Sequence, residues 1–153
     1  MAIPTRASSY GTFFISTQTY QRRRLFQVAT NAELFLDTLQ HYRDEGHYKL
    51  HAYVVMPDHI HLLITPQSIT LERAVMLIKG GFAHRLASNL TVWQRGFTDR
   101  RMRDRDDFLT HRTYIHNNPV RAKLCQVPED YPYSSAHRQQ TSTTEEILPQ
   151  PAL

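Results

Sequence analysis

Two histidines placed two residues apart are the residues whose spacing most directly points to chemistry. His59 and His61 lie in the segment VVMPDHIHLLIT, residues 54–65, which otherwise has the composition of an apolar strand. Side chains two apart on a strand project from the same face, with Cα atoms about 6.5–7 Å apart. Two neutral imidazoles at that separation can converge on one transition-metal ion. Spacing alone leaves two alternatives open: surface histidines facing a neighbouring strand, and a hydrogen-bonded pair.

A second candidate site lies in the segment TYIHNNPVRAKL, residues 113–124. Tyr114 and Asn118 are four residues apart, so on the helix expected here they are neighbours on one face. One interpretation makes Tyr114 a core aromatic residue with its hydroxyl at the rim, and Asn118 the cap of a helix that ends before Pro119. The other makes Tyr114 a nucleophile and Asn118 an amide ligand to a metal. Periodicity does not decide between them.

The elements that must position these residues follow from the hydrophobic pattern and from turn residues. Strands are expected at 10–20, 48–56 and 59–65, with a short strand within 92–102, and helices at 29–46, 70–90 and 104–118. Gly80 and Gly81 fall inside the second helix, where we expect either a bend or the close approach of a backbone or phosphate.

This order of elements predicts an α+β fold of the ferredoxin-like or RRM-like kind. It has an antiparallel four-stranded sheet with helices on one face and an added C-terminal helix that carries Tyr114. Hydrophobic residues at 60, 62 and 64 mark the face of the third strand that points toward the helices. The histidines then lie on the opposite face, which we expect to be open to a ligand.

Composition limits the class of protein. The chain has 153 residues, of which 41% are hydrophobic and 21% charged, as in a globular protein. We assign residues 1–137 to one domain and 138–153, which are polar and contain proline, to a mobile tail. No apolar run approaches the roughly 20 residues that span a bilayer. The N-terminus lacks the pattern of a secretory signal, and the single cysteine, Cys125, fits a reducing cytoplasm.

Basic residues are clustered. The formal charge is +4; RGFTDRRMRDR at 95–105 contains five arginines and QRRR at 21–24 adds three. The planar guanidinium group matches phosphate, so these clusters indicate contact with nucleic acid. The alternative is a solvated surface, in which nearby aspartates dilute the field. The candidate DNA-binding residues are Lys79, Arg100, Arg101, Arg103 and Arg105.

Five segments occur together in one order: YVVMPDHIHLLI, IKGGFAHRL, VWQRGFTDRRMRDRDDF, YIHNNPVRAKL and PEDYPYSSA. In this combination the chain resembles the single-tyrosine transposases of the HUH nuclease superfamily. Among these it looks most like the REP-associated tyrosine transposases. The resemblance extends over roughly residues 10–137, nearly the whole expected domain.

The resemblance implies a role for each candidate residue. His59 and His61 match the family's metal ligands, and Tyr114 matches its catalytic tyrosine. Asn118 matches the third ligand, a position where the insertion-sequence enzymes often have glutamine. The implied cofactor is a divalent metal ion, Mg²⁺ or Mn²⁺. It would act on a phosphate as a Lewis acid while the tyrosine, a poor nucleophile with an ordinary pKa near 10, forms a 5′-phosphotyrosine.

The implied substrate is single-stranded DNA, at the foot of a hairpin of the REP type. We therefore expect a bacterial cytoplasmic enzyme associated with the nucleoid, without a membrane partner, and acting as a monomer or a homodimer. Two other functions stay open. One is a catalytically silent nucleic-acid-binding regulator derived from a transposase. The other is a metal-dependent hydrolase that uses water, although no obvious general base beside the histidine pair supports it.

Overall fold

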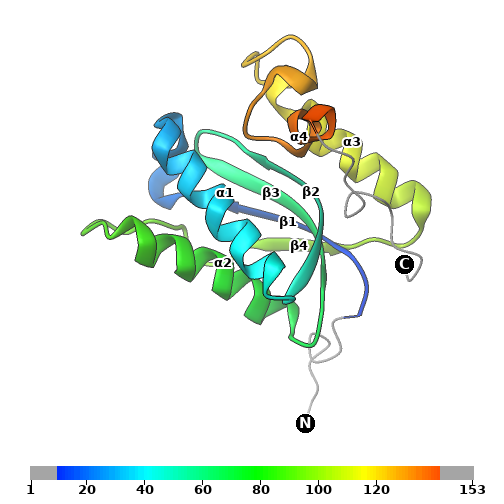
Figure 1. Cartoon of the computed structure of the whole chain (residues 1–153), viewed down its shortest axis with the longest axis horizontal. Helices are drawn as coiled ribbons and strands as arrows, with labels where there is room; N and C mark the ends of the chain where they lie inside the picture. Colours follow the sequence, from blue (N-terminus) through cyan, green and yellow to red (C-terminus); the bar gives the residue numbers. More distant parts are fainter. Residues whose placement is uncertain (1–9, 142–153) are drawn as a thin grey trace.

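One antiparallel sheet organises the protein (Figure 1). The computed structural model describes residues 10–141. The strands are β1 (Phe13–Gln18), β2 (Tyr48–Val55), β3 (His59–Pro66) and β4 (Thr98–Arg101), in the order β2-β3-β1-β4. The α-helices are α1 (Ala29–Asp44), α2 (Leu71–Leu86), α3 (Arg105–Arg121) and α4 (Ser135–Thr141), and short 3-10 turns are η2 (Tyr20–Arg22), η3 (Leu25–Gln27) and η4 (Pro128–Asp130). The expected α+β fold is confirmed.

Helices α1 and α2 cover one face of the sheet (Figure 1). Ile60, Leu62 and Ile64 of β3 point into this core and are 1% exposed or less. Phe13 and Ile15 of β1 are buried in the same core. Alternate residues of a strand face opposite sides, so burial of this set turns the odd-numbered residues of β3 to the other face. The expected burial of positions 60, 62 and 64 is confirmed.

Helix α3 packs on the second face, which we had expected to be open. Leu63 of β3 is fully buried against Phe108 and Ile115 of α3, in a second core that also contains Tyr131. The apolar residues that β2 and β3 present on this face explain the difference, because they need a cover of their own. The part of this face near His59 and His61 stays accessible to a ligand.

The ends of α3 differ from the expectation. The helix continues through Pro119 to Arg121, whereas the sequence predicted its end before the proline. A proline inside a helix removes one backbone donor, but the next turn still closes because Ala122 N donates to the Asn118 carbonyl over 3.0 Å. Asn118 therefore lies within the helix and is not its cap.

The glycine pair of α2 does not interrupt the helix, and only one of the two glycines has a close neighbour. Helix α2 is continuous from Leu71 to Leu86, and Thr70 caps it by accepting a hydrogen bond from Arg73 N. A Cβ atom on Gly81 would lie 2.6 Å from the Tyr42 hydroxyl of α1, whereas one on Gly80 would meet nothing within 4 Å. The close approach at Gly81 is thus made by a side chain of the neighbouring helix.

The segment after α3 returns to the sheet. The Tyr131 hydroxyl donates to the Val55 carbonyl over 2.6 Å, and Ser134 forms a bridge with Val54. Residues 138–141, the first four of the expected tail, belong to α4, and the remainder of that tail lies outside the described residues. Within residues 10–141, none of the helices combines the length and the apolar character needed to cross a membrane.

Candidate active site

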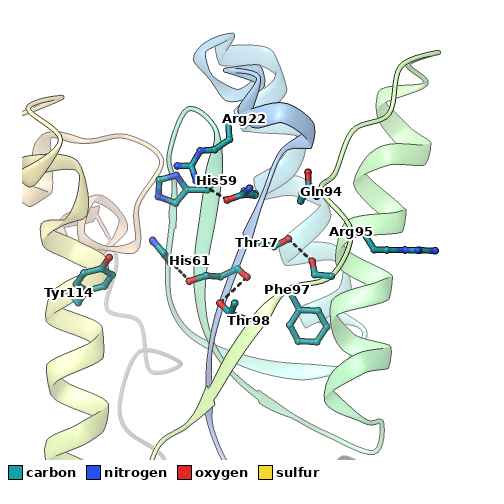
Figure 2. A pocket seen from close by; sticks show the side chains of 12 residues that line it. Thr17, Arg22, His59, His61, Gln94, Arg95, Phe97, Thr98 and Tyr114 are labelled. Carbon is teal, nitrogen blue, oxygen red and sulfur yellow. Dashed lines mark hydrogen bonds between the residues drawn. The ribbon is translucent and has the colours of Figure 1, made fainter.

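His59 and His61 lie side by side on the face of β3 that looks toward α3 (Figure 2). Their ring centroids are 4.9 Å apart. This is the arrangement that their spacing on a strand predicted, and it places both rings at the wall of one cavity of about 550 Å³.

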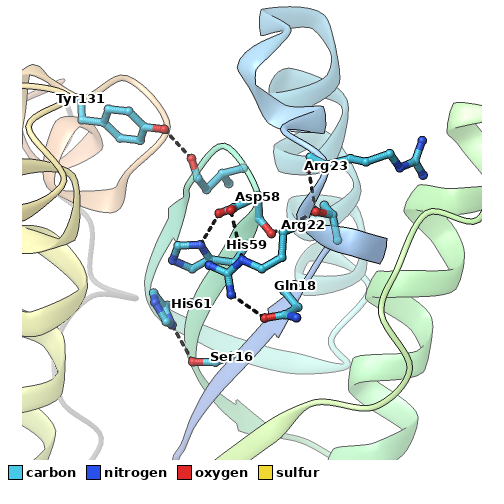
Figure 3. Close-up of polar contacts among 10 residues, drawn as sticks. Ser16, Gln18, Arg22, Arg23, Asp58, His59, His61 and Tyr131 are labelled. Atoms are coloured by element: carbon cyan, nitrogen blue, oxygen red, sulfur yellow. Dashed lines mark hydrogen bonds and ion pairs between the residues drawn. The ribbon is translucent and has the colours of Figure 1, made fainter.

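Each imidazole is held at Nδ1 by a different neighbour (Figure 3). His61 Nδ1 lies 2.6 Å from the hydroxyl of Ser16, its partner across the β1–β3 ladder. His59 Nδ1 lies 2.7 Å from a carboxylate oxygen of Asp58, in the turn between β2 and β3. With the hydrogen on Nδ1, the lone pair of each ring is on Nε2, the form in which histidine binds a metal ion.

Burial controls the charge of His61. Desolvation, followed by the proximity of His59, lowers the pKa of His61 to about 3, so this imidazole is neutral at neutral pH. Burial alone would raise the pKa of Asp58, but hydrogen bonds from His59 and Arg22 outweigh it and lower that pKa below its ordinary value. A neutral imidazole at His61 and an ionised carboxylate at Asp58, on the same side of the sheet, suit a cation.

Helix α3 brings Tyr114 to the histidines (Figure 2). Its ring centroid lies 5.5 Å from that of His61, and the side chain is 37% exposed and lines the same cavity. The guanidinium carbon of Arg121 lies 5.0 Å from the centre of the tyrosine ring. A phenol hydroxyl and two oriented imidazoles, from segments far apart in the sequence, thus face one solvent-accessible space.

Asn118 is on the same helix but in a more enclosed position. It is 9% exposed, and the described residues that line the cavity include Tyr114 but not Asn118. Its role as a metal ligand stays a prediction.

The side chains present fit a divalent ion with an incomplete protein ligand set. Residues 10–141 contain no cluster of three or more histidine, cysteine, aspartate or glutamate residues suited to hold a metal ion. Two imidazoles are available at the pair, so any third ligand from the protein would be of another kind, and a side-chain amide is one that hard divalent cations accept.

Two of the candidate DNA-binding arginines lie on different faces of the edge strand β4. Arg100 pairs with Phe14 of β1, which places its side chain on the face of the histidines. Arg101 pairs with Phe13, and its guanidinium lies 5.9 Å from that ring on the opposite face. Arg100 is therefore the better placed of the two for a strand that enters the cavity.

The other candidates differ in their contacts. Arg105 is exposed at the start of α3, and Arg103 is 3.4 Å from the buried carboxylate of Asp107. The Lys79 ammonium donates to the carbonyls of Gln94 and Gly96 over 3.1 and 2.7 Å, and burial lowers its pKa. Lys79 fastens the loop before β4, and its binding to DNA stays a prediction, as it does for the arginines.

Sequence reasoning overlooked two polar residues near the histidines. Gln18 and Arg22 line the cavity, and Arg22 also contacts Asp58. The QRRR segment was visible as a charge cluster, but nothing local singled out its first arginine. Arg22 lines the cavity because of the conformation of the turn that follows β1, which the local sequence does not reveal.

Comparison with known proteins places the chain in a family. The family model described as "Transposase IS200 like" matches residues 13–118, a range that includes both histidines, Tyr114 and Asn118. The chain belongs to this transposase family. The resemblance found in the motifs is confirmed, and the chain is a member of a family of DNA-processing enzymes.

Among relatives, the chain is 27% identical over 130 residues to the REP-associated tyrosine transposase of Escherichia coli, covering 84% of this chain and 78% of the relative. It is 30% identical over 119 residues to a Haemophilus influenzae protein provisionally named a REP-associated tyrosine transposase. That match covers 68% of this chain and 65% of the relative, so the chain spans about two thirds of that relative's length.

The fold has a solved counterpart. A REP-associated tyrosine transposase bound to a REP hairpin superposes with a TM-score of 0.78 and 23% identity, covering 99% of this chain and 96% of that one. At this identity the likeness establishes the shared fold.

Proposed function

We propose that this transposase cuts and rejoins single-stranded DNA with Tyr114 as the nucleophile. The observation that carries the proposal is the placement of Tyr114, on α3, beside two imidazoles of β3 whose Nδ1 atoms are already held by Ser16 and Asp58. A nucleophile next to a cation site, in a cavity that a strand can enter, is an arrangement that supports metal-assisted phosphoryl transfer.

His59 and His61 would hold a divalent ion, Mg²⁺ or Mn²⁺, through Nε2, with Asn118 as the third ligand. When bound, the ion supplies Lewis-acid polarisation of a phosphate oxygen. The Tyr114 oxygen forms a bond to phosphorus while the bond from phosphorus to the 3′ oxygen of the neighbouring nucleotide breaks. The products are a 5′-phosphotyrosine and a free 3′-hydroxyl, and attack by another 3′-hydroxyl reverses the step and rejoins strands.

The substrate we propose is a single strand next to a hairpin of the REP type. The name of the solved relative, which was bound to a REP hairpin, supports this assignment, as does the exposed Arg100 on the face of the histidines. Such a protein would act at the bacterial nucleoid, as a monomer or a homodimer.

Covalent capture tests this function. The protein is incubated with Mn²⁺ and an end-labelled oligonucleotide that carries a hairpin and its single-stranded flank from the DNA beside its gene. We expect an adduct that survives denaturing electrophoresis, that EDTA prevents, and that Tyr114→Phe abolishes. Tyr10→Phe is the matched control, because Tyr10 is 76% exposed and lies outside the cavity.

Two outcomes would contradict the proposal. An adduct of equal yield with Tyr114→Phe would show that Tyr114 is not the nucleophile. Tight binding that EDTA does not affect, without any adduct, would identify a catalytically silent regulator, and turnover without a protein-linked product would identify a hydrolase that uses water.

A further inference from the structure

The turn that leaves β1 has an unusual backbone. Gln21 and Arg22, which are consecutive and neither of them glycine, have φ angles of 55° and 53°. Left-handed backbone costs an L-residue about 1–2 kcal/mol, so two such residues in succession persist only where the surroundings enforce them.

Contacts to the β2–β3 turn enforce this conformation. Thr19, which is fully buried, donates from its backbone N to the Asp58 carbonyl over 3.0 Å, and its hydroxyl donates to the carbonyl of Arg23 over 2.7 Å. Farther along, Phe26 N donates to the Pro57 carbonyl over 3.0 Å. The strained turn is therefore fastened to the same loop that carries the partner of His59.

The strained turn delivers the Arg22 guanidinium into the cavity of the histidines (Figures 2 and 3). Its Nε donates to Asp58 over 3.2 Å and one terminal nitrogen donates to the Gln18 amide oxygen over 2.7 Å. Within residues 10–141, no protein group accepts from the other terminal nitrogen, and the side chain is 54% exposed. Two of the three guanidinium nitrogens are thus fixed, and the remaining terminal nitrogen keeps two N–H donors on a side chain that lines the cavity.

Asp58 does not simply neutralise this arginine. One of its carboxylate oxygens contacts Arg22 and the other contacts His59 Nδ1 over 2.7 Å. A single negative charge is therefore shared between two donors, and the guanidinium keeps the capacity to bind an anion. A guanidinium nitrogen with two unengaged N–H donors, on a side chain already held in place, is well suited to phosphate oxygens.

We propose that Arg22 binds a backbone phosphate of the DNA strand that enters the cavity of His59, His61 and Tyr114. This inference rests on the proposed function, since it requires a nucleic-acid strand there. It also gives the strained turn a role, which is to position the Arg22 guanidinium. Arg24, two residues farther along, is exposed and lies outside the cavity.

Binding without chemistry tests the assignment. The chain with Tyr114→Phe is titrated in EDTA against a fluorescent oligonucleotide that carries a hairpin and its single-stranded flank from the DNA beside the gene. We expect Arg22→Gln to weaken binding about tenfold, as for a lost hydrogen bond to a charged group. The slope of log K against log salt should become shallower by about 0.7, the value for one phosphate contact on a single strand. Arg24→Gln removes the same charge and should leave the slope unchanged.

A scan with neutral linkages locates the contact. Single methylphosphonates are placed at successive positions of the flank, and wild-type Arg22 and Arg22→Gln are compared at each. We expect one linkage where the wild-type affinity falls to that of Arg22→Gln and the two changes are not additive. Arg22→Lys should keep the salt slope and lose part of the affinity, which excludes misfolding as the cause.

The proposal is overturned if Arg22→Gln and Arg24→Gln change the slope equally, or if every linkage gives additive effects. It is also overturned if Arg22→Gln lowers only metal-dependent adduct formation, because Arg22 would then act through Asp58 and His59. A different result separates the two proposals. If the wild-type chain forms no adduct but its binding still depends on salt and on Arg22, the proposed strand transfer is refuted and the phosphate contact stands.

Discussion

Each imidazole of the histidine pair depends on one oxygen atom for its orientation. Ser16 serves His61 and Asp58 serves His59, and in both cases the contact is at Nδ1. The common face of the histidines could be predicted, because alternation along a strand is a local property. Ser16 could not be predicted, because its place opposite His61 follows from the register between β1 and β3.

Ser16→Ala should weaken Mn²⁺ binding by about 10–100-fold, the usual effect of removing a partner of a metal-bound histidine. Without the hydroxyl, the ring of His61 loses the group that fixes its orientation. Isothermal titration with Mn²⁺ measures the change directly. Ser88→Ala, in the exposed loop after α2, is the control, and equal affinities for the two variants would contradict the assignment.

A partly buried histidine of α3 makes stability depend on pH. His116 of α3 lies 2.8 Å from the Ser135 hydroxyl, and burial followed by the charge of Arg112 lowers its pKa to about 4. Its folded pKa is below its unfolded value of about 6.5, so the unfolded chain binds the proton more readily. The contribution of neutral His116 is therefore complete above about pH 6.5 and is lost as the pH falls toward 4.

From this shift we expect the free energy of unfolding to fall by about 2 kcal/mol between pH 7 and pH 5 on account of His116. Urea denaturation in EDTA at the two pH values measures the loss. His116→Gln should show a correspondingly smaller loss, whereas the exposed His84→Gln should behave as wild type. Parallel losses in all three proteins would exclude His116 as the source.

At the scale of elements, two neighbouring glycines in α2 have different surroundings. The helix itself could be predicted from its apolar periodicity and its Thr70 cap. The reason for Gly81 could not, because Tyr42 approaches it from α1, and which residues meet between two helices is not a property of either segment alone. Gly80 lacks any such neighbour within 4 Å.

Gly80→Ala should stabilise the fold by up to about 1 kcal/mol, the difference in helix propensity between the two residues. Gly81→Ala gains the same propensity but places its Cβ against the ring of Tyr42, which must move. We expect Gly81→Ala to be less stable than Gly80→Ala by about 1–2 kcal/mol, since overpacking costs that much. Thermal denaturation compares Gly80→Ala with Gly81→Ala. Identical midpoints would show that the Tyr42 ring moves aside without a cost in stability.

At the scale of the whole molecule, the sheet separates two cores, and the candidate site lies where the second core ends. The first core could be predicted from positions 60, 62 and 64. The docking of α3 on the second face could not, because residues such as Phe108 and Ile115 meet Leu63 only through contacts distant in sequence. Tyr114 therefore reaches the histidines through the packing of its neighbour Ile115.

Ile115→Ala should lower the free energy of unfolding by about 2–5 kcal/mol, as for other large-to-small core substitutions. It should also reduce adduct formation more than Mn²⁺ affinity, because α3 carries the tyrosine whereas the histidines are on the sheet. Ile78→Ala, on the buried side of α2 in the first core, is the matched control. If Ile78→Ala loses as much stability and as much adduct as Ile115→Ala, general destabilisation explains the loss of adduct in both variants.

The register of the β1–β3 ladder has a consequence for folding. Ser16 faces His61 and Gln18 faces His59 across this pair of strands. A slip of one residue would turn Ser16 away from His61, since neighbouring residues on a strand point to opposite sides. An ion bound to the correctly oriented imidazoles would favour the native pairing over every slipped one, because a ligand stabilises the state that binds it. The metal would then stabilise the correct strand register as well as take part in the reaction.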